Sequence, residues 1–352
     1  MPISAMWVGG WGHLDNTDLI YATNATGSWV TTTVDSSGRA WGYTSIALDA
    51  AGHAHISYYD GIRDELKYAT NASGAWVTTT VDSEGSVGFF NSIAIDATGH
   101  AHIAYFDYDK WDLKYATNAS GSWVTTMVDG NGYVGEYNSI ALDSKGHAHI
   151  SYHNAYNIDL KYATNASGAW VTTAVDSSGK VGFDTSLVLD SKDHVHISYN
   201  DEWNSDLKYA TNKSGHWVTE AVATDGYVGW RTSLSLDAYD KAHISHYDVF
   251  KRDLKYTTNA SGRWMTMTVD SRGNTGPDSS IGVDASGRAH ISYGNRTLAD
   301  LLYATGIPPS AAITRPATRI TKTSATLNAT INANRLPTQA WFERKFTSMY
   351  FA

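Results

Sequence analysis

The chain has 352 residues, a formal net charge of −9 and no cysteine, and 12% of its residues are aromatic while 17% are charged. This composition excludes disulfides, thiolate metal sites and a cysteine nucleophile, and the negative charge without a basic cluster argues against nucleic acid as a partner. No run of 18 apolar residues predicts a membrane span, and the N-terminal residues lack the charged and apolar pattern of a signal peptide.

A repeat with a step of 47 residues dominates the sequence. A tryptophan followed by Val-Thr, or by Met-Thr in the last copy, marks one repeat position at Trp29, Trp76, Trp123, Trp170, Trp217 and Trp264. A tyrosine two residues after a leucine marks another, at Tyr21, Tyr68, Tyr115, Tyr162, Tyr209, Tyr256 and Tyr303. So strict a period predicts a stack of equivalent units.

Each unit is predicted to hold four short β segments, which we call A to D. In the first complete unit these are residues 45–49, 53–59, 66–70 and 76–81. They are rich in β-branched and aromatic residues, and Gly, Asn, Asp or Ser bounds each one. Four antiparallel strands in a unit of this length predict the blade of an all-β propeller.

The ends of the repeat leave the number of blades open. Five complete units start near residues 45, 92, 139, 186 and 233. The N-terminal copy has C and D and a weak B candidate at 6–8, whereas the C-terminal copy has A, B and C without D. We expect seven blades. Six is the alternative, because the N-terminal D could complete the C-terminal copy and so close a six-blade ring.

The predicted propeller covers residues 1–305, and residues 306–352 form a linker with a tail. Pro308-Pro309 is typical of a linker. Residues 311–342 resemble the opening strands of a fibronectin-type-III-like domain, but at about half of its length, which is too short for a core of its own. We therefore expect the tail to be disordered or to dock on the propeller.

A His-x-His pattern in segment B is the first candidate for chemistry. His55 and its equivalents occur in six copies, and alternation along a strand places both histidines of a pair on one face. A metal pair is one interpretation. The pattern recurs six times without a third ligand, which favours a structural role. In that role each histidine would bond to the residue of its own copy that is equivalent to Asp49 or to Ser57, which we call the Asp49-type and Ser57-type partners. We therefore predict no metal and no cofactor.

Variation between the copies is concentrated in the B–C and D–A links, while the A–B and C–D links are nearly constant. Because the strands of a meander alternate in direction, the two variable links emerge on one face of the disc. Loops on a rigid scaffold commonly carry function, although single aromatic rings here could instead wedge between blades. The predicted ligand-binding residues are Trp41, Tyr43, Phe90, Asp107, Trp111, Tyr137, Tyr156, Asp201, Trp203, Trp230 and Asp248.

The four-segment repeat resembles bacterial β-propeller repeats of the Asp-box, NHL and sugar-binding, lectin-like kinds, over about residues 5–305, although the Asp49-Ala50-Ala51-Gly52 turn has one residue more than the Asp-box phrase. The resemblance implies a monomeric extracellular or cell-surface protein whose partners are glycans or a surface protein. We expect non-enzymatic carbohydrate recognition by the variable links. The alternatives are a protein-interaction scaffold and a polysaccharide lyase or glycoside hydrolase, for which the copy-specific residues His153, His246 and Tyr247 are the candidates.

Overall fold

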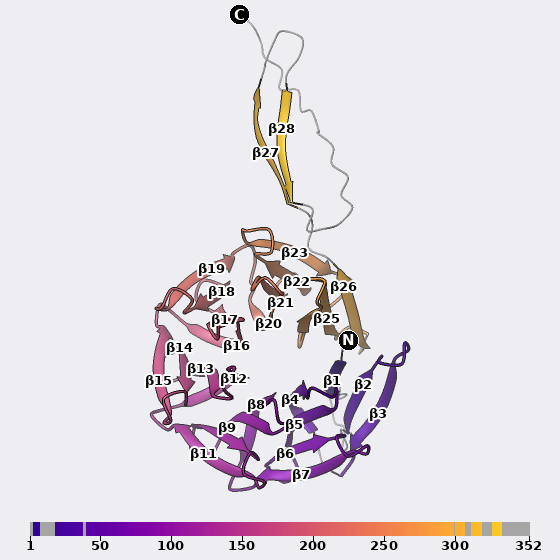
Figure 1. Ribbon diagram of the computed structural model, residues 1–352, viewed down its shortest axis with the longest axis vertical. Helices are drawn as coiled ribbons and strands as arrows, with labels where there is room; N and C mark the ends of the chain where they lie inside the picture. The colour runs from indigo at the N-terminus through magenta and orange to yellow at the C-terminus, as the bar shows by residue number, and fades with distance from the viewer. Residues whose placement is uncertain are drawn as a thin grey trace, which may run out of the picture.

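The computed structural model describes residues 3–7, 18–37, 40–298, 300–306, 311–318 and 326–332. These residues form 28 β-strands. Seven antiparallel sheets are arranged around a central axis, and a separate hairpin of β27 (Ala311–Thr318) and β28 (Thr326–Asn332) follows them (Figure 1). Within the described ranges there is no helix of the length and apolarity needed to cross a membrane. The predicted all-β propeller is confirmed.

Five of the sheets are complete four-stranded blades, and their strands follow one another from the axis outward. Their strands are β4 (Ala40–Leu48), β5 (Ala54–Asp60), β6 (Glu65–Thr70) and β7 (Val77–Asp82); β8 (Val87–Ile95), β9 (Ala101–Asp107), β10 (Asp112–Thr117) and β11 (Val124–Asp129); β12 (Val134–Leu142), β13 (Ala148–Asn154), β14 (Asp159–Thr164) and β15 (Val171–Asp176); β16 (Val181–Leu189), β17 (Val195–Asp201), β18 (Asp206–Thr211) and β19 (Val218–Ala223); and β20 (Trp230–Leu236), β21 (Ala242–Asp248), β22 (Asp253–Thr258) and β23 (Met265–Asp270).

The two remaining sheets of the ring are three-stranded. One consists of β24 (Ser280–Val283), β25 (Ala289–Asn295) and β26 (Asp300–Gly306), with no outer strand among the described residues; the other consists of β1 (Ile3–Trp7), β2 (Leu19–Thr23) and β3 (Val30–Asp35), with no innermost strand in the described part of the chain. Six blades thus contribute an innermost strand, which matches the alternative count and not the expected seven, and β1–β3 is a further, partial sheet. The predicted weak segment at 6–8 is the end of β1, except for Val8, which lies outside the described residues.

The seam of the ring lies between these two partial sheets. The N-terminal outer strand β3 pairs with β2 rather than with β26, so the ring does not close by the strand exchange that the six-blade alternative assumed. Instead, Trp29 contacts Tyr303 edge-on, with ring centroids 5.9 Å apart. The seam is therefore held by the same kind of aromatic contact that joins the other blades.

The hydrophobic core lies between neighbouring blades. In the cluster shared by the third and fourth sheets, Leu113 and Tyr115 pack against Ile140, Ile150 and Tyr152. Every residue of the second strand β13 is buried, whereas the first four residues of the outer strand β15 are exposed. Burial of apolar area between sheets is the main stabilising term of such a fold, and each blade needs its neighbours to obtain it.

The turns divide the links between two faces of the disc, as predicted. At one end, the Ala54 amide beside an A–B link donates a hydrogen bond to Asn71 Oδ1 in a C–D link, at 2.8 Å. The Asn71 side chain therefore stabilises the turns at this end. At the other end, the Tyr108 amide of a B–C link donates to the Ser86 carbonyl of a D–A link, at 2.9 Å. We call this second end the variable face.

The recurrent histidines belong to the structural network. His149 Nδ1 lies 2.5 Å from the Tyr162 hydroxyl, and its Nε2 lies 3.5 Å from Asp143 Oδ2. Burial lowers the pKa of His149, which keeps the ring neutral. The Asp49-type partner is thus confirmed, but the Ser57-type partner is wrong, because the Ser57 hydroxyl bonds to Asn91 of the next blade at 2.6 Å.

Candidate ligand-binding face

The D–A links enter the innermost strands through a strained backbone. Gly88 has a φ of +103°, and a Cβ there would lie 2.9 Å from the Leu66 Cα of the preceding blade. Only glycine allows so close an approach. Two residues later Phe90 has a φ of +49°, which is costly for a bulky side chain. The register shift between Phe89 and Ser92 is a β-bulge that holds this residue in place.

The strained position recurs in the later blades and carries a different side chain in most of them. With Tyr43, these residues form what we call the axial ring, because they lie on or at the entrance of the innermost strands (Figure 1). Its members are Tyr43, Phe90, Tyr137, Asp184, Arg231 and Asp278, and all except Tyr43 have φ values between 48° and 61°.

One half of the axial ring is aromatic and the other half is ionic. The ring centroid of Phe90 lies 4.7 Å from that of Tyr43 and 4.6 Å from that of Tyr137. Arg231 Nε lies 3.9 Å from Asp184 Oδ1 and 3.8 Å from Asp278 Oδ1. The Arg231 amide also donates to Asp184 Oδ2, at 3.0 Å. The structure thus brings together three of the residues named in the sequence analysis, Tyr43, Phe90 and Tyr137, beside charged groups.

Electrostatics set the protonation of this ring. Burial raises the pKa of Asp184, although Arg231 opposes the shift. Burial also raises the pKa of Tyr137, and the charges of Asp184 and Glu136 add to that effect, so Tyr137 keeps its hydroxyl proton. The guanidinium of Arg231 lies between two carboxylates. The axial ring therefore presents π faces and hydrogen-bonding groups without a surplus of positive charge.

An aromatic network extends from the axial ring toward the rim of the variable face. Phe89 contacts Tyr43 at 5.6 Å and Tyr108 at 5.3 Å between ring centroids. Trp111 stacks on Tyr133 at 5.4 Å. Tyr108 and Trp111 are 52% and 53% exposed, so their outer surfaces remain open to a ligand while their inner surfaces pack against the blade.

The tips of the next three B–C links carry the most exposed aromatic side chains of this face. Tyr156, Trp203 and Phe250 are 79%, 72% and 78% exposed and occupy one repeat position. Trp203 also lines a hollow of about 260 Å³ with Lys180, Glu202 and Tyr227, which we call the tip hollow. Lys180 Nζ lies 3.9 Å from Glu202 Oε2 across it. An aromatic face thus stands beside one cation and one anion.

The three predicted aspartates occupy different surroundings from the aromatics. Asp107, Asp201 and Asp248 are buried, and each caps its own B–C link. Asp201 Oδ1 accepts the Asn204 amide at 3.1 Å, and Asp248 Oδ1 accepts the Lys251 amide at 3.0 Å. The structure does not bring these carboxylates to the surface, since the turn itself uses them.

Two further predicted residues contribute differently. Trp230 is half-buried and packs edge-on against Tyr227, with ring centroids 5.7 Å apart, beside the tip hollow. The side chain of Trp41 lies outside the described residues.

The copy-specific histidines that the sequence offered as catalytic candidates are inside the blades. His153 is 2% exposed, with Nδ1 3.1 Å from the Val181 carbonyl, and burial lowers its pKa to about 4. His246 is fully buried, and burial lowers its pKa to about 3. The Tyr247 hydroxyl donates to Asn274 at 2.8 Å. Neither histidine is exposed on the variable face, although the ring of His153 contacts that of Tyr137 at 6.1 Å between centroids.

Sequence reasoning missed the ionic half of the axial ring and one carboxyl group. Asp184, Arg231 and Asp278 occupy the same repeat position as Tyr43. The repeat would therefore have identified them if charged side chains had been considered as ligand-binding candidates together with aromatic ones. Glu136 was also missed; it accepts a hydrogen bond from the Tyr133 hydroxyl at 2.9 Å, and burial raises its pKa. Within the described ranges, no cluster of histidine and carboxylate side chains is arranged to hold a metal ion.

No protein-family model and no curated protein matches the chain. Solved structures do resemble it in fold. An Aleuria aurantia lectin mutant in complex with Fucα1-6GlcNAc has a TM-score of 0.55 at 12% identity, over 84% of this chain and 96% of that one. Kuenenia stuttgartiensis hydrazine synthase has a TM-score of 0.58 at 11% identity, covering 83% and 92%. A Penicillium chrysogenum α-L-arabinanase complexed with arabinobiose has a TM-score of 0.53 at 9% identity, covering 75% and 92%. Identities this low show a shared propeller fold alone.

Proposed function

We propose that the protein is a non-enzymatic carbohydrate-binding propeller and that the variable face is its binding surface. The observation that carries the proposal is Trp203, a largely exposed indole that lines a hollow with Lys180 and Glu202. The flat C–H face of a sugar ring packs on such an aromatic face, while its hydroxyl groups bond to the neighbouring ammonium and carboxylate groups. The fold likeness to a fucose-bound lectin is consistent with this use of the scaffold.

The charge of the face favours neutral glycans. The axial ring holds one guanidinium against two carboxylates, and the chain as a whole has a net charge of −9. An acidic sugar would meet repulsion there, whereas neutral hydroxyl groups would find donors and acceptors. We therefore propose glycans on a cell surface or on a surface protein as the partners, and an extracellular, monomeric protein as their receptor.

The first experiment combines a glycan array with titration calorimetry on the full chain. We expect dissociation constants in the micromolar to millimolar range for neutral oligosaccharides, and Trp203→Ala should weaken binding about tenfold or more. Tyr239→Ala is the matched control, because Tyr239 is 62% exposed on an A–B link of the opposite face. Absence of sugar binding at millimolar concentrations, with capture of a protein partner that sugars do not displace, would replace this proposal by an interaction scaffold.

Glycoside hydrolysis is the second candidate, and Glu136 is the observation that favours it. Burial raises the pKa of this half-buried carboxyl group, which shifts it toward the protonated form that a general acid uses. Tyr133 holds the carboxyl group through its hydroxyl. Release of reducing ends by the wild-type chain, with loss of that release in Glu136→Gln, would establish hydrolysis in place of simple binding.

A further inference from the structure

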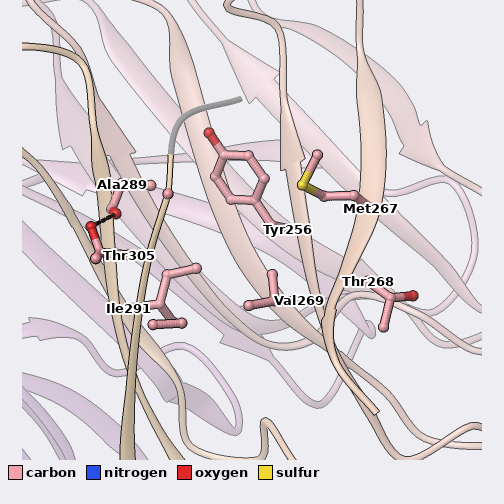
Figure 2. A pocket seen from close by; sticks show the side chains of 9 residues that line it. Tyr256, Met267, Thr268, Val269, Ala289, Ile291 and Thr305 are labelled. Atoms are coloured by element: carbon pink, nitrogen blue, oxygen red, sulfur yellow. Dashed lines mark hydrogen bonds between the residues drawn. The ribbon is translucent and has the colours of Figure 1, made fainter. Parts of the chain in front are cut away.

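The outer edge of β26 is an open sheet edge beside an apolar groove. In every complete blade the third strand pairs with an outer strand, but within the described ranges β26 pairs with β25 alone. A groove of about 240 Å³ lies against β26 (Figure 2). Tyr256, Met267 and Val269 line one side of it, and Ile291 and Ala304 line the other. An unpaired edge beside apolar side chains is a site for strand addition.

The other blade interfaces show what normally fills this place. A tryptophan at the start of each outer strand packs edge-on against a tyrosine of the preceding blade, with ring centroids 5.0 to 5.2 Å apart in Tyr21–Trp76, Tyr68–Trp123, Tyr115–Trp170, Tyr162–Trp217 and Tyr209–Trp264. Tyr256 occupies the next such position. The residue at the corresponding tryptophan position is Ala311, which lies in β27 and pairs with β28 instead. The groove thus lies where a complete blade has its outer strand.

One later segment of the chain repeats the pattern of the outer strands. Those strands have tryptophan, then valine or methionine, then three exposed residues and then valine, as in Trp76 to Val81. Residues 340–346 read Ala-Trp-Phe-Glu-Arg-Lys-Phe, with Trp341 preceded by alanine as Trp76 is, and with Phe346 at the position of Val81. The three charged residues between them suit the solvent-facing part of an outer strand. This segment lies outside the described residues.

The chain can reach the groove from the hairpin. Ala311 pairs with Asn332, so the end of β28 lies beside the start of β27, which begins five positions after Gly306 in the sequence. Trp341 follows Asn332 by nine positions in the sequence. A chain of that length spans up to about 30 Å when extended, which exceeds the step from a third strand to an outer strand several times over.

We propose that residues 341–347 of this chain add to β26 as its outer strand, with Trp341 seated against Tyr256. The register of the complete blades, in which Thr70 is opposite Val77, then places Phe342 opposite Thr305. Phe346 fills the buried position near the far end of the strand. The last blade gains its fourth strand, and the groove is covered by the chain's own tail.

The cysteine-free sequence allows a direct test by cross-linking. Thr305→Cys with Phe342→Cys places two thiols on directly opposite residues, where a disulfide forms readily under mild oxidation. We expect near-complete intramolecular cross-linking of the full chain. Thr305→Cys with Thr330→Cys is the control, because Thr330 is paired with Ile313 in the hairpin, and it should cross-link at least tenfold more slowly. Equal rates for the two pairs, or disulfide-linked dimers in place of monomers, would overturn the proposal.

A second measurement covers the case in which the cysteine variants fold poorly. This measurement is hydrogen exchange of the Trp341→Ala variant, which carries no cysteine substitution. We expect the β26 amides to exchange about tenfold faster in this variant than in the wild type, and the β14 amides to exchange at the same rate in both. Phe351→Ala is the control and should change neither strand. Unchanged protection of β26 in Trp341→Ala would contradict the docked tail, whatever the outcome of the glycan experiments.

Discussion

Single residues join neighbouring blades through a buried polar network. Asp129, at the end of an outer strand, accepts hydrogen bonds from the Tyr152 hydroxyl at 2.7 Å and from Lys161 of the next blade. The same arrangement joins Asp35 to Tyr58 and Lys67, Asp82 to Tyr105 and Lys114, and Asp176 to Tyr199 and Lys208. The network ties each outer strand to the interior of its neighbour.

One interface has exchanged this network for another. Ala223 stands at the aspartate position, and His246 stands at the tyrosine position of the next blade. His246 Nε2 bonds to Thr257 at 2.9 Å, and Thr257 itself occupies a position that holds alanine in the complete copies before it. The three changes form one alternative hydrogen-bonding set. A copy-specific histidine therefore marks an altered interface here and not a reactive centre.

Removing the shared carboxylate should be strongly destabilising. Asp129→Ala leaves the Lys161 ammonium and the Tyr152 hydroxyl buried without their partner, so we expect a loss of about 3–5 kcal/mol in the free energy of unfolding. Chemical denaturation followed by tryptophan fluorescence measures it. Asp225→Ala removes a fully exposed carboxylate and should change the stability by less than about 0.5 kcal/mol. A similar small effect of Asp129→Ala would show that the network contributes little.

The buried histidines predict a loss of stability in acid. The pKa of His153 is about 4 in the folded chain against 6.5 ordinarily. The unfolded chain therefore binds more protons as the pH falls below 6.5, and stability is lost down to the folded pKa. Asn200 occupies the position of His153 in the next blade and donates to the equivalent Val228 carbonyl at 2.9 Å, so His153→Asn keeps the bond without the titration.

We expect His153→Asn to reduce the stability loss between pH 7.5 and pH 5 by about 2 kcal/mol, as measured by urea denaturation at the two pH values. Exposed His216 supplies the control, since His216→Asn should leave the loss unchanged. An identical loss in the wild type and in His153→Asn would show that this ring does not stay neutral in the folded chain.

At the scale of the element, the D–A link is the part of the blade with the least freedom. Its glycine faces the backbone of the preceding blade, whereas the glycine of the C–D link, such as Gly74, has open space around it at a similar φ of +90°. The two positions share the conformational constraint and differ in crowding. This difference allows the two effects to be separated.

Gly88→Ala should cost about 1–3 kcal/mol more than Gly74→Ala in the free energy of unfolding, because only the former forces two blades apart. Thermal denaturation of both variants measures the difference. Equal costs would mean that the link moves away freely and that the axial ring is not held by its close contact.

The sequence predicted the strands, the turns and the variable face because each depends on local pattern. Alternation and β-branched residues located the strands, and Gly52 or Asp193 located the A–B turns, where both residues have a positive φ. The left-handed conformation of Phe90 and Tyr137 could not be predicted, because nothing local favours it for an aromatic residue and a bulge imposes it. The burial of Asp107 could not be predicted either, because an aspartate in a link can either cap the turn or face solvent.

At the scale of the whole molecule, the ring has one weak sector. The sheets on either side of the seam have three described strands each, so they bury less than the complete blades do. The number of blades could not be read from the repeat for the same reason, because strand pairing at the two ends depends on contacts far apart in sequence. Trp29 and Tyr303 make that contact across most of the chain length.

Hydrogen exchange should reveal the seam directly. We expect the amides of β2 to exchange at least tenfold faster than those of β14, which holds the same place in a complete blade. Mass spectrometry of peptic fragments resolves these strands. Uniform protection around the ring would show that the partial sheets are as secure as the complete ones.

The divided composition of the axial ring also bears on stoichiometry. Six equivalent positions with identical side chains would offer a symmetric ligand several interchangeable orientations, but a ring with three aromatic and three charged members offers only one. A ligand at the axis should therefore bind once per molecule and in a fixed orientation, whereas the exposed link tips around the rim can each hold a separate residue of a branched chain. Titration of a monovalent sugar and of a multivalent polymer should accordingly give different numbers of sites.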